Sequence, residues 1–226
     1  NVIDYVTIAS AGNATDFGDL TEARYSPAGA SSNTRGIFAG SGSGTYGNVI
    51  DYITIASTGN ATDFGDTLEV RDALAGLANS TKAVYGGGRN DSGGSTTIQQ
   101  VTIATTGNAT DFGDMTAAKS YAMGACSGAD AVQNEAGFAP AAMGLLVGIG
   151  ASGAHTTIQY LNIATTGSFA MCGDIHVGSD YDQANGTIAN ATRGVFAEGA
   201  TGNTYYYSTF STKGKTTNFG NVATNS

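Results

Sequence analysis

The sequence contains a repeated Asp-Phe-Gly motif, whose aspartate could hold a metal ion. The stretch GNATDFGD occupies residues 12–19, and the same eight letters return at residues 59–66 and 107–114. In a protein kinase a DFG aspartate binds Mg²⁺, but that chemistry also requires a glycine-rich loop, a paired lysine and a catalytic loop. The sequence contains none of these, and a catalytic aspartate would not be copied three times. The stretch is therefore predicted to be structural, as part of a strand and its turn.

Aspartates beside a turn could also bind calcium, because Ca²⁺ prefers several oxygen ligands. The weak calcium candidates are Asp16, Asp63 and Asp111, one in each copy of the stretch. The alternative is that these carboxylates accept hydrogen bonds from turn amides, as Asp and Asn commonly do. The two histidines and two cysteines lack the spacing of a zinc site, so we expect no metal, no other cofactor and no catalytic residues.

The composition excludes several classes of partner. The chain has 226 residues, a formal net charge of −9, only 12% charged residues and 34 glycines. Because it has no basic patch, it is not expected to bind nucleic acid through the phosphates. No stretch approaches the roughly 20 apolar residues of a membrane helix, so membrane insertion is not expected either. The sequence begins at Asn1, from which we expect a processed product or a part of a longer protein.

The sequence is built from a repeat of roughly 48 residues. The best-marked unit reads IDYVTIASAGNATDFGDL in its first copy, and its copies start at Ile3, Ile50, Ile98, Ile158 and Tyr205. A second unit, in which small residues precede a run such as RGIFAG, lies between these copies. It occupies residues 28–41, 75–88 and 186–199, and a stretched version ends at residues 143–150.

Each period can be interpreted as four short β-strands. A small-residue strand such as LAGLA and an apolar strand such as RGIFAG form what we call the inner hairpin, and IDYITIAS with TDFGDL forms the outer hairpin. The Gly-Asn pair between the two outer strands is predicted to form the hairpin turn, since both residues tolerate positive φ. Both faces of the middle two strands carry apolar side chains, which indicates sheets packed on both sides. The predicted core anchors of the last strand are Phe17, Phe64, Phe112 and Phe219.

Four strands in a period of about 40–50 residues are typical of β-propellers. The pattern resembles kelch repeats, in which one strand ends in two glycines, the next carries a tyrosine and the last an aromatic residue. The matching positions are Gly86–Gly87 after AVY, Tyr52 in IDYITI and Phe64 in TDFGD. The sequence IDYITIASTGNATDFGD, together with RGIFAG, resembles the kelch-like repeats of large structural proteins of marine bacteriophages, especially cyanophages. The resemblance implies a component of a virion or fibre and says nothing about a reaction.

We therefore expect an all-β fold in which residues 1–226 form a single kelch-like β-propeller of about five blades, one of which could be incomplete. The sequence holds five outer hairpins but only four inner hairpins. Three arrangements stay open. The ring could contain one two-stranded blade, which we favour, or residues beyond Ser226 could supply the missing hairpin, or a neighbouring subunit could donate it.

One loop is longer than its counterparts. The third period has about twelve extra residues, which fall between residues 126 and 143, and an elaborated loop on a repeated scaffold is a common place for binding. The binding-loop candidates are Asp130, Gln133, Asn134, Glu135 and Phe138. The alternative is that the loop packs over the channel mouth or against a neighbouring subunit.

The function expected from these observations is that of a non-enzymatic structural or adhesion module. It would belong to a virion or an extracellular fibre, such as a tail fibre, and serve assembly or attachment to a host surface. Its partners would be other copies or other structural subunits of the same assembly. The alternative is a carbohydrate-binding, lectin-type propeller, in which each repeat carries one shallow pocket for a cell-surface glycan.

Overall fold

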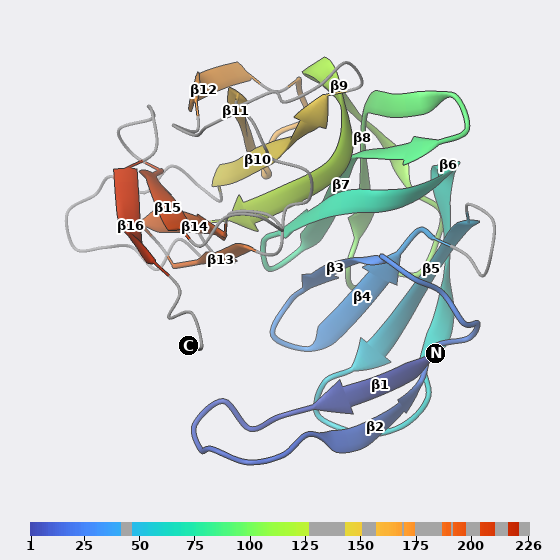
Figure 1. Ribbon diagram of the computed structural model, residues 1–226. Coiled ribbons are helices and arrows are strands. Elements are labelled where there is room, and N and C mark those ends of the chain that lie inside the picture. Colours follow the sequence, from blue (N-terminus) through green and yellow to red (C-terminus); the bar gives the residue numbers. More distant parts are fainter. Residues whose placement is uncertain are drawn as a thin grey trace.

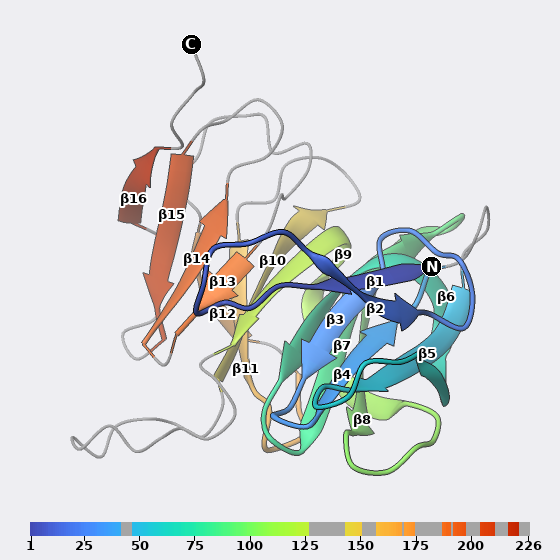
Figure 2. The same cartoon turned by 90° about the horizontal axis from the view of Figure 1, so that it is seen from below.

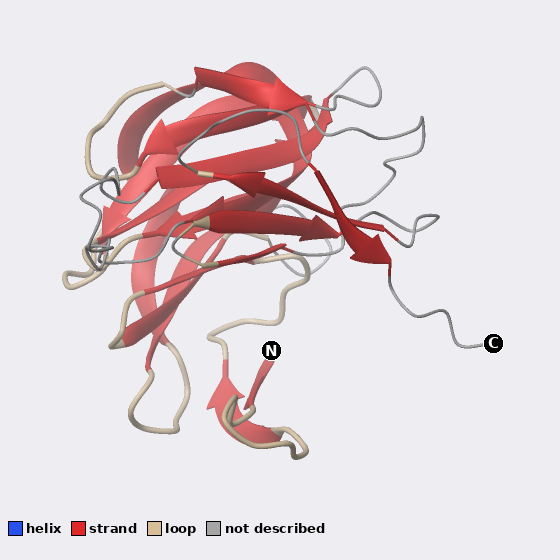
Figure 3. Cartoon of the chain, turned by 90° about the vertical axis from the view of Figure 1, so that its left-hand side faces the viewer, coloured by secondary structure: helices blue, strands red, loops and turns tan. Residues whose placement is uncertain are grey.

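The computed structural model describes residues 1–41, 47–126, 143–150, 157–168, 170–174, 187–190, 192–197, 204–210 and 217–221. In these residues the protein is all-β, as the sequence predicts, and every strand pairing is antiparallel (Figure 3). The described part of the chain contains no helix long and apolar enough to cross a membrane.

The strands form three sheets (Figure 1). The two-stranded sheet consists of β1 (Val2–Tyr5) and β2 (Thr15–Asp19). The ten-stranded sheet consists of β3 (Ala28–Ser31), β4 (Arg35–Ala39), β5 (Gly47–Thr54), β6 (Thr62–Ala78), β7 (Lys82–Asn90), β8 (Gly93–Thr102), β9 (Thr110–Cys126), β10 (Met143–Gly150), β11 (Thr157–Asn162) and β12 (Ala170–Asp174). The four-stranded sheet consists of β13 (Thr187–Ala189), β14 (Arg193–Ala197), β15 (Thr204–Thr209) and β16 (Thr217–Asn221).

Each period from the first inner hairpin onward forms a unit of four neighbouring strands. In the clearest example, the end of β6 pairs with β7, β7 with β8, and β8 with the start of β9. The same order holds in β3–β4–β5–β6, in β9–β10–β11–β12 and in β13–β14–β15–β16. Each of these four-stranded units thus joins one inner hairpin to the following outer hairpin.

Strands β6 and β9 belong to two units at once, because each is 17 residues long and bends midway. The first part of β6 pairs with β5, whereas Asp72 to Ala78 pair with β7. At the bends, Ala73 and Tyr121 have φ angles of 52° and 49°, which is left-handed backbone. The sequence suggests a separate sheet for each period. The structure instead joins ten strands in one curling sheet, because β6 and β9 continue through their bends (Figures 1 and 2).

Successive units pack face to face. On β7, Tyr85 belongs to a core cluster that includes Ile50 and Phe64 of the preceding unit. Its neighbour Val84 points to the other face and belongs to a second cluster, which includes Leu161 of the following unit. The middle unit is therefore buried on both faces, as the apolar pattern of its strands indicates.

Glycines let the first strands of successive units approach closely. A Cβ atom added to Gly76 on β6 would collide with the backbone oxygen of Gly29 on β3. A Cβ atom on Gly124 of β9 would lie 2.9 Å from the oxygen of Gly76. The next strand follows the same order, since the hydroxyl of Thr187 on β13 donates to the oxygen of Gly124. The small residues of these strands are thus required by backbone-to-backbone packing.

Tyr85 provides a test of the packing between units. Its side chain is 0% exposed and its hydroxyl has no hydrogen-bond partner among the described residues. Removing an unsatisfied buried hydroxyl should not destabilise the fold, so Tyr85→Phe should leave the free energy of unfolding unchanged or raise it by about 1–2 kcal/mol in urea titrations. Tyr85→Ala, the control, should lose about 3–5 kcal/mol by leaving a cavity. A loss above about 1 kcal/mol in Tyr85→Phe would show that the hydroxyl is bonded.

The same residue predicts a difference at alkaline pH. Burial raises the pKa of Tyr85 far above its ordinary value, so the folded protein keeps the hydroxyl neutral. In the unfolded chain the hydroxyl ionises near pH 10, so the stability linked to Tyr85 is present below that pH and declines as the pH rises. We expect Tyr85→Phe to gain on the wild type by about 1.4 kcal/mol for each pH unit above roughly 10. If the difference in unfolding free energy between Tyr85→Phe and the wild type is the same below and above pH 10, this expectation is wrong.

Candidate functional site: the junctions between repeats

At three junctions among the described residues, the loop of an outer hairpin binds the last strand of the preceding outer hairpin. At the first junction the N–H of Gly59 donates to the oxygen of Phe17 at 2.7 Å, and the N–H of Ala61 donates to the oxygen of Asp19 at 2.8 Å. The side-chain oxygen of Asn60 accepts a hydrogen bond from the N–H of Asp19 at 3.1 Å. We call this three-bond arrangement the clasp.

The clasp recurs along the chain. At the second junction Gly107 N–H bonds to Phe64 O at 2.7 Å, Ala109 N–H to Asp66 O at 2.7 Å, and Asp66 N–H to Asn108 Oδ1 at 3.0 Å. At the third, Gly167 N–H bonds to Phe112 O at 2.9 Å and Asp114 N–H to Ser168 Oγ at 3.4 Å. The repeated GNATDFGD residues therefore form both halves of one contact. The Gly and Ala N–H groups donate to the Phe and Asp carbonyl oxygens, and the Asn side chain accepts from the Asp N–H.

The clasp corrects the expected role of the Gly-Asn pair. The chain reverses earlier in the loop, where the N–H of Ser10 bonds to Thr7 O at 3.2 Å and that of Ser57 bonds to Thr54 O at 3.2 Å. Gly59 and Asn60 do not form this reversal, because the Gly59 N–H and the Asn60 side chain bind the neighbouring hairpin. Sequence reasoning from a single hairpin could not detect that contact.

The glycine of each DFG stretch is required by the clasp. Gly65 has a φ of +142°, and a Cβ atom there would lie 2.6 Å from the carbonyl group of Gly107. Gly113 has the same geometry, with a φ of +145° and 2.7 Å to Gly167. Only a residue without a side chain accommodates both the backbone angle and the approaching loop.

The aspartates considered for calcium accept hydrogen bonds from the backbone. The Oδ1 atom of Asp16 accepts from the N–H of Gly18 at 3.1 Å, and that of Asp63 accepts from the N–H of Gly65 at 3.0 Å. Asp111 is exposed at the equivalent position. Within the described residues, no three His, Cys, Asp or Glu side chains gather in a group that could hold a metal ion. The carboxylates of Asp16 and Asp63 thus accept hydrogen bonds from backbone amides, which is the alternative to calcium binding.

A second tie, which sequence reasoning missed, crosses each of the same junctions. Asp51, Gln99 and Gln159 are equivalent residues with exposures of 0%, 1% and 0%. Their side-chain oxygens accept from the backbone N–H groups of Thr21 at 3.1 Å, Leu68 at 2.6 Å and Thr116 at 2.9 Å, respectively. The signal for this tie was an acid or amide directly after the first isoleucine of each of these outer hairpins, at positions 51, 99 and 159.

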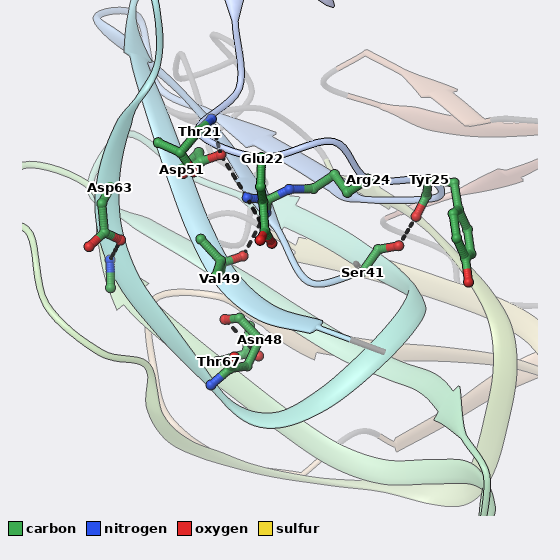
Figure 4. A network of polar contacts seen from close by, with 11 residues as sticks. Thr21, Glu22, Arg24, Tyr25, Ser41, Asn48, Val49, Asp51, Asp63 and Thr67 are labelled. Carbon is green, nitrogen blue, oxygen red and sulfur yellow. Dashed lines mark hydrogen bonds and ion pairs between the residues drawn. The ribbon is translucent and has the colours of Figure 1, made fainter. Parts of the chain in front are cut away.

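The first of these ties also contains a buried ion pair (Figure 4). The Arg24 and Asp51 side chains are both 0% exposed, and Arg24 Nη2 lies 2.7 Å from Asp51 Oδ2. The Thr21 hydroxyl donates to Asp51 at 2.7 Å, and Arg24 Nη1 donates to the oxygen of Val49 at 2.8 Å. Glu22 lies 3.6 Å from the same guanidinium. The charge of Arg24 is therefore balanced inside the junction.

Arg24 begins a row of equivalent basic residues, which continues with Arg71 and Lys119. Arg71 is 8% exposed, and its Nε donates to the carboxylate of Glu69 at 2.6 Å. Lys119 is 0% exposed, and burial lowers the pKa of its amine. A basic side chain thus lies at the same place in three successive junctions, and its surroundings differ from one junction to the next.

Three of the four predicted aromatic anchors are buried. Phe17, Phe64 and Phe112 are 8%, 2% and 3% exposed, whereas Phe219 is 60% exposed. The expectation for Phe219 is therefore corrected, and the reason is local. Among the described residues no clasp loop covers β16, and a Cβ atom on Gly220 would meet nothing within 4 Å.

Aromatic pairs connect the two strands of the outer hairpins. Tyr52 and Phe64 pack edge to face at 5.9 Å, and the Arg35 guanidinium lies 4.4 Å from the Tyr52 ring centre. Tyr207 and Phe219 pack at 6.1 Å, with Arg193 4.6 Å from the Tyr207 ring. These stacks place the repeated aromatics in intramolecular contacts.

The binding-loop candidates Asp130, Gln133, Asn134, Glu135 and Phe138 lie outside the described residues. Binding at that loop therefore stays a prediction.

Comparisons with known proteins assign no family. No protein-family model matches the chain, and no curated protein matches it. The functional conclusion therefore rests on the junctions themselves.

The clasp can be tested with two equivalent asparagines. Asn60→Ala removes the acceptor of the Asp19 N–H and should lower the free energy of unfolding by about 1 kcal/mol, measured by chemical denaturation. Asn13, its counterpart in the first hairpin, is exposed and forms no side-chain hydrogen bond among the described residues, so Asn13→Ala should change stability by less than about 0.5 kcal/mol. Equal losses in both variants would contradict a role in the clasp.

The buried ion pair predicts an order among substitutions. Asp51→Ala leaves Arg24 buried without a close carboxylate and should cost about 3–5 kcal/mol. Asp51→Gln, the residue type found at positions 99 and 159, should cost less because it can still accept from Thr21. The double variant Arg24→Met, Asp51→Leu should recover much of the loss, because no buried charge remains. If the double variant is the least stable of the three in urea titrations, the charge account is wrong.

Proposed function

We propose that the chain is a non-enzymatic structural or adhesion module of a virion or extracellular fibre, built as a kelch-like β-propeller of about five blades. One observation carries the proposal: residues that recur in three repeats are used in contacts between repeats. The glycine, asparagine and backbone groups of GNATDFGD form the clasp. Residues that make the same internal contact at successive junctions have a structural role, as expected of a scaffold.

The packing of the units supports the propeller form of this proposal. The middle four-stranded unit is buried between its neighbours, and the glycine-containing first strands approach one another in sequence order from β3 to β6 and β9. Sheets that meet face to face, with the smallest residues on the most crowded strand, suit a radial arrangement. The first outer hairpin would then be the incomplete blade.

The resemblance to cyanophage repeats supports the location. A rigid module whose conserved-looking letters are internal leaves its loops free to vary, which suits surface display. Its partners would be copies or other structural subunits of the same assembly.

The lectin alternative receives no specific support from the described residues. It requires similar exposed aromatics at several junctions for sugar stacking. Tyr52 instead packs on Phe64 and on the guanidinium of Arg35. We therefore retain the glycan only as an outcome of the experiment below.

The location is tested by mass spectrometry of cyanophage particles purified in a density gradient. Trypsin releases residues 72–82, DALAGLANSTK, because Arg71 precedes the fragment and Lys82 ends it. We expect this peptide in the particle band together with the major virion proteins. Its recovery only from the unsedimented host fraction would contradict the proposal.

Adhesion is tested by binding of the labelled protein to host cells. Retention on untreated cells, and its loss on cells stripped of surface protein, would support attachment through a protein partner. Loss on periodate-treated cells, together with binding on a glycan array, would favour the lectin alternative.

A further inference from the structure

The three junctions differ in how firmly the clasp closes. At the first two junctions an asparagine side chain accepts from the aspartate N–H at 3.1 and 3.0 Å. At the third junction Ser168 takes the place of the asparagine and accepts from the Asp114 N–H at 3.4 Å. The bond from the clasp glycine to the phenylalanine oxygen is 2.7 Å long at the first two junctions and 2.9 Å at the third. The third clasp is therefore held by longer and weaker hydrogen bonds.

The charges at the junctions follow the same order. At the first junction two carboxylates, those of Asp51 and Glu22, lie 2.7 and 3.6 Å from Nη2 of Arg24. At the second junction an amide takes the place of the aspartate, and the carboxylate of Glu69 accepts from Nε of Arg71 at 2.6 Å. The number of carboxylates at these two equivalent positions thus falls from two to one between the first and second junctions.

The third junction has an acid at neither position. Ala117 occupies the place of Glu69, and Gln159 occupies the place of Asp51. Burial lowers the pKa of Lys119, the basic residue of this junction, because the ammonium form is poorly solvated there. The carboxylates that balance the arginines of the other two junctions therefore have no counterpart in the sequence of the third.

The buried amide of Gln159 uses only one of its two ends. Its Oε1 accepts from the Thr116 N–H at 2.9 Å, whereas its Nε2 has no hydrogen-bond partner among the described residues. The other junctions also leave one buried nitrogen each without a partner in this part of the chain. Those nitrogens, Arg24 Nε and Arg71 Nη1, belong to guanidiniums that bind carboxylates through their other nitrogens. The buried donor of Gln159 has no such compensation, so it makes opening less costly.

The bend of β9 gives an opening at the third junction a place to turn. The equivalent residues Ser26, Ala73 and Tyr121 have φ angles of 53°, 52° and 49°. Left-handed backbone is least favourable for a bulky side chain, so the bend at Tyr121 is the most strained of the three. The Arg89 guanidinium lies 4.3 Å from the Tyr121 ring centre, and the Arg89 side chain is 37% exposed. An exposed cation–π contact of this kind holds the bend only weakly.

We propose that the third junction is a hinge, which opens before the other two. Strands β10, β11 and β12, which lie at one end of the ten-stranded sheet, would swing away from the middle unit about the bend at Tyr121 (Figure 1). This motion uncovers apolar surface, because Leu161 and Ile163 share a buried cluster with Val84 and Phe112 of the middle unit. The inference rests on the contacts at the junctions and does not depend on the proposed location in a virion.

Amide hydrogen exchange measured by NMR on the whole chain compares the three junctions within one molecule. The N–H groups of Gly59, Gly107 and Gly167 make the same clasp bond at successive junctions. After correction for intrinsic rates, we expect Gly167 to exchange at least roughly tenfold faster than the other two, because exchange of each amide follows the local opening of its junction. If Gly167 exchanges as slowly as Gly107, the proposal is wrong.

Two substitutions restore features of the first two junctions. Ser168→Asn gives the third clasp the acceptor found at Asn108, and Gln159→Glu keeps an acceptor for Thr116 while it places a carboxylate where Asp51 stands. Each should slow the exchange of Gly167 by roughly three- to tenfold, the size expected for one hydrogen bond. If neither substitution slows Gly167, the proposed cause of opening is refuted.

The matched control makes the reverse change at the second junction. Asn108→Ser gives that junction the acceptor of the third, so it should speed the exchange of Gly107 by a similar factor and leave Gly59 unchanged. Equal acceleration of Gly59 and Gly107 would show that these amides report global unfolding, which would overturn an order of opening among the junctions.

Reactivity of Lys119 distinguishes a hinge from fraying of the clasp loop alone. The Lys119 side chain is 0% exposed, so its amine can react with acetic anhydride only when the junction opens. Acetylation of Lys119, measured by mass spectrometry, should slow in Ser168→Asn by the same factor as the exchange of Gly167. Fast exchange at Gly167 together with an unreactive Lys119 would show that only the loop moves, and the hinge would be ruled out.

Discussion

Backbone hydrogen bonds that cross from one repeat to the next are the constraint on which this structure depends. A two-stranded hairpin is at best marginally stable in water. The first two outer hairpins each gain a further pair of backbone bonds from the loop of the next outer hairpin, and the third gains one, at the cost of a fixed loop shape. That shape explains why a long string of letters is kept almost unchanged. The glycine must admit the incoming loop, and the asparagine must reach the amide on the other side.

The sequence predicted the strands and their order well, because each strand has a local signal. Alternating apolar letters, glycines and Asn-rich turns set the four strands of a unit without help from distant residues. The sequence also predicted burial on both faces of β7, since Val84 and Tyr85 are adjacent and both apolar. Phe17, Phe64 and Phe112 follow from the same reasoning.

The contacts between units could not be predicted in this way. The role of Asn60 depends on Asp19, which lies 41 residues away, and nothing in either hairpin alone indicates the pairing. Arg24 and Asp51 are separated by 27 residues and look like two ordinary surface charges in the sequence. Phe219 shows the opposite failure. Its letters match those of Phe64, but burial comes from a neighbour that β16 lacks among the described residues.

The polar groups of the junctions have a common character. Asp51, Gln99 and Gln159 are buried at the seams between hairpins, and each accepts a hydrogen bond from a backbone N–H on the far side of its seam. Unpaired polar groups in such places are costly, so the units are not independent modules joined by a string. Removing one unit would expose donors and acceptors on both of its neighbours.

Near-identical repeats carry a danger of assembling in the wrong order, because any loop can form the clasp with any DFG strand. The buried charges distinguish the seams. If the third hairpin took the place of the second, Gln99 would lie where Asp51 belongs, and Arg24 would keep only Glu22, at 3.6 Å. Arg71 has its own carboxylate in Glu69 and tolerates an amide across the seam. The ion pair at the first seam thus favours the hairpin that carries Asp51 and disfavours the similar hairpins that carry glutamine there during folding.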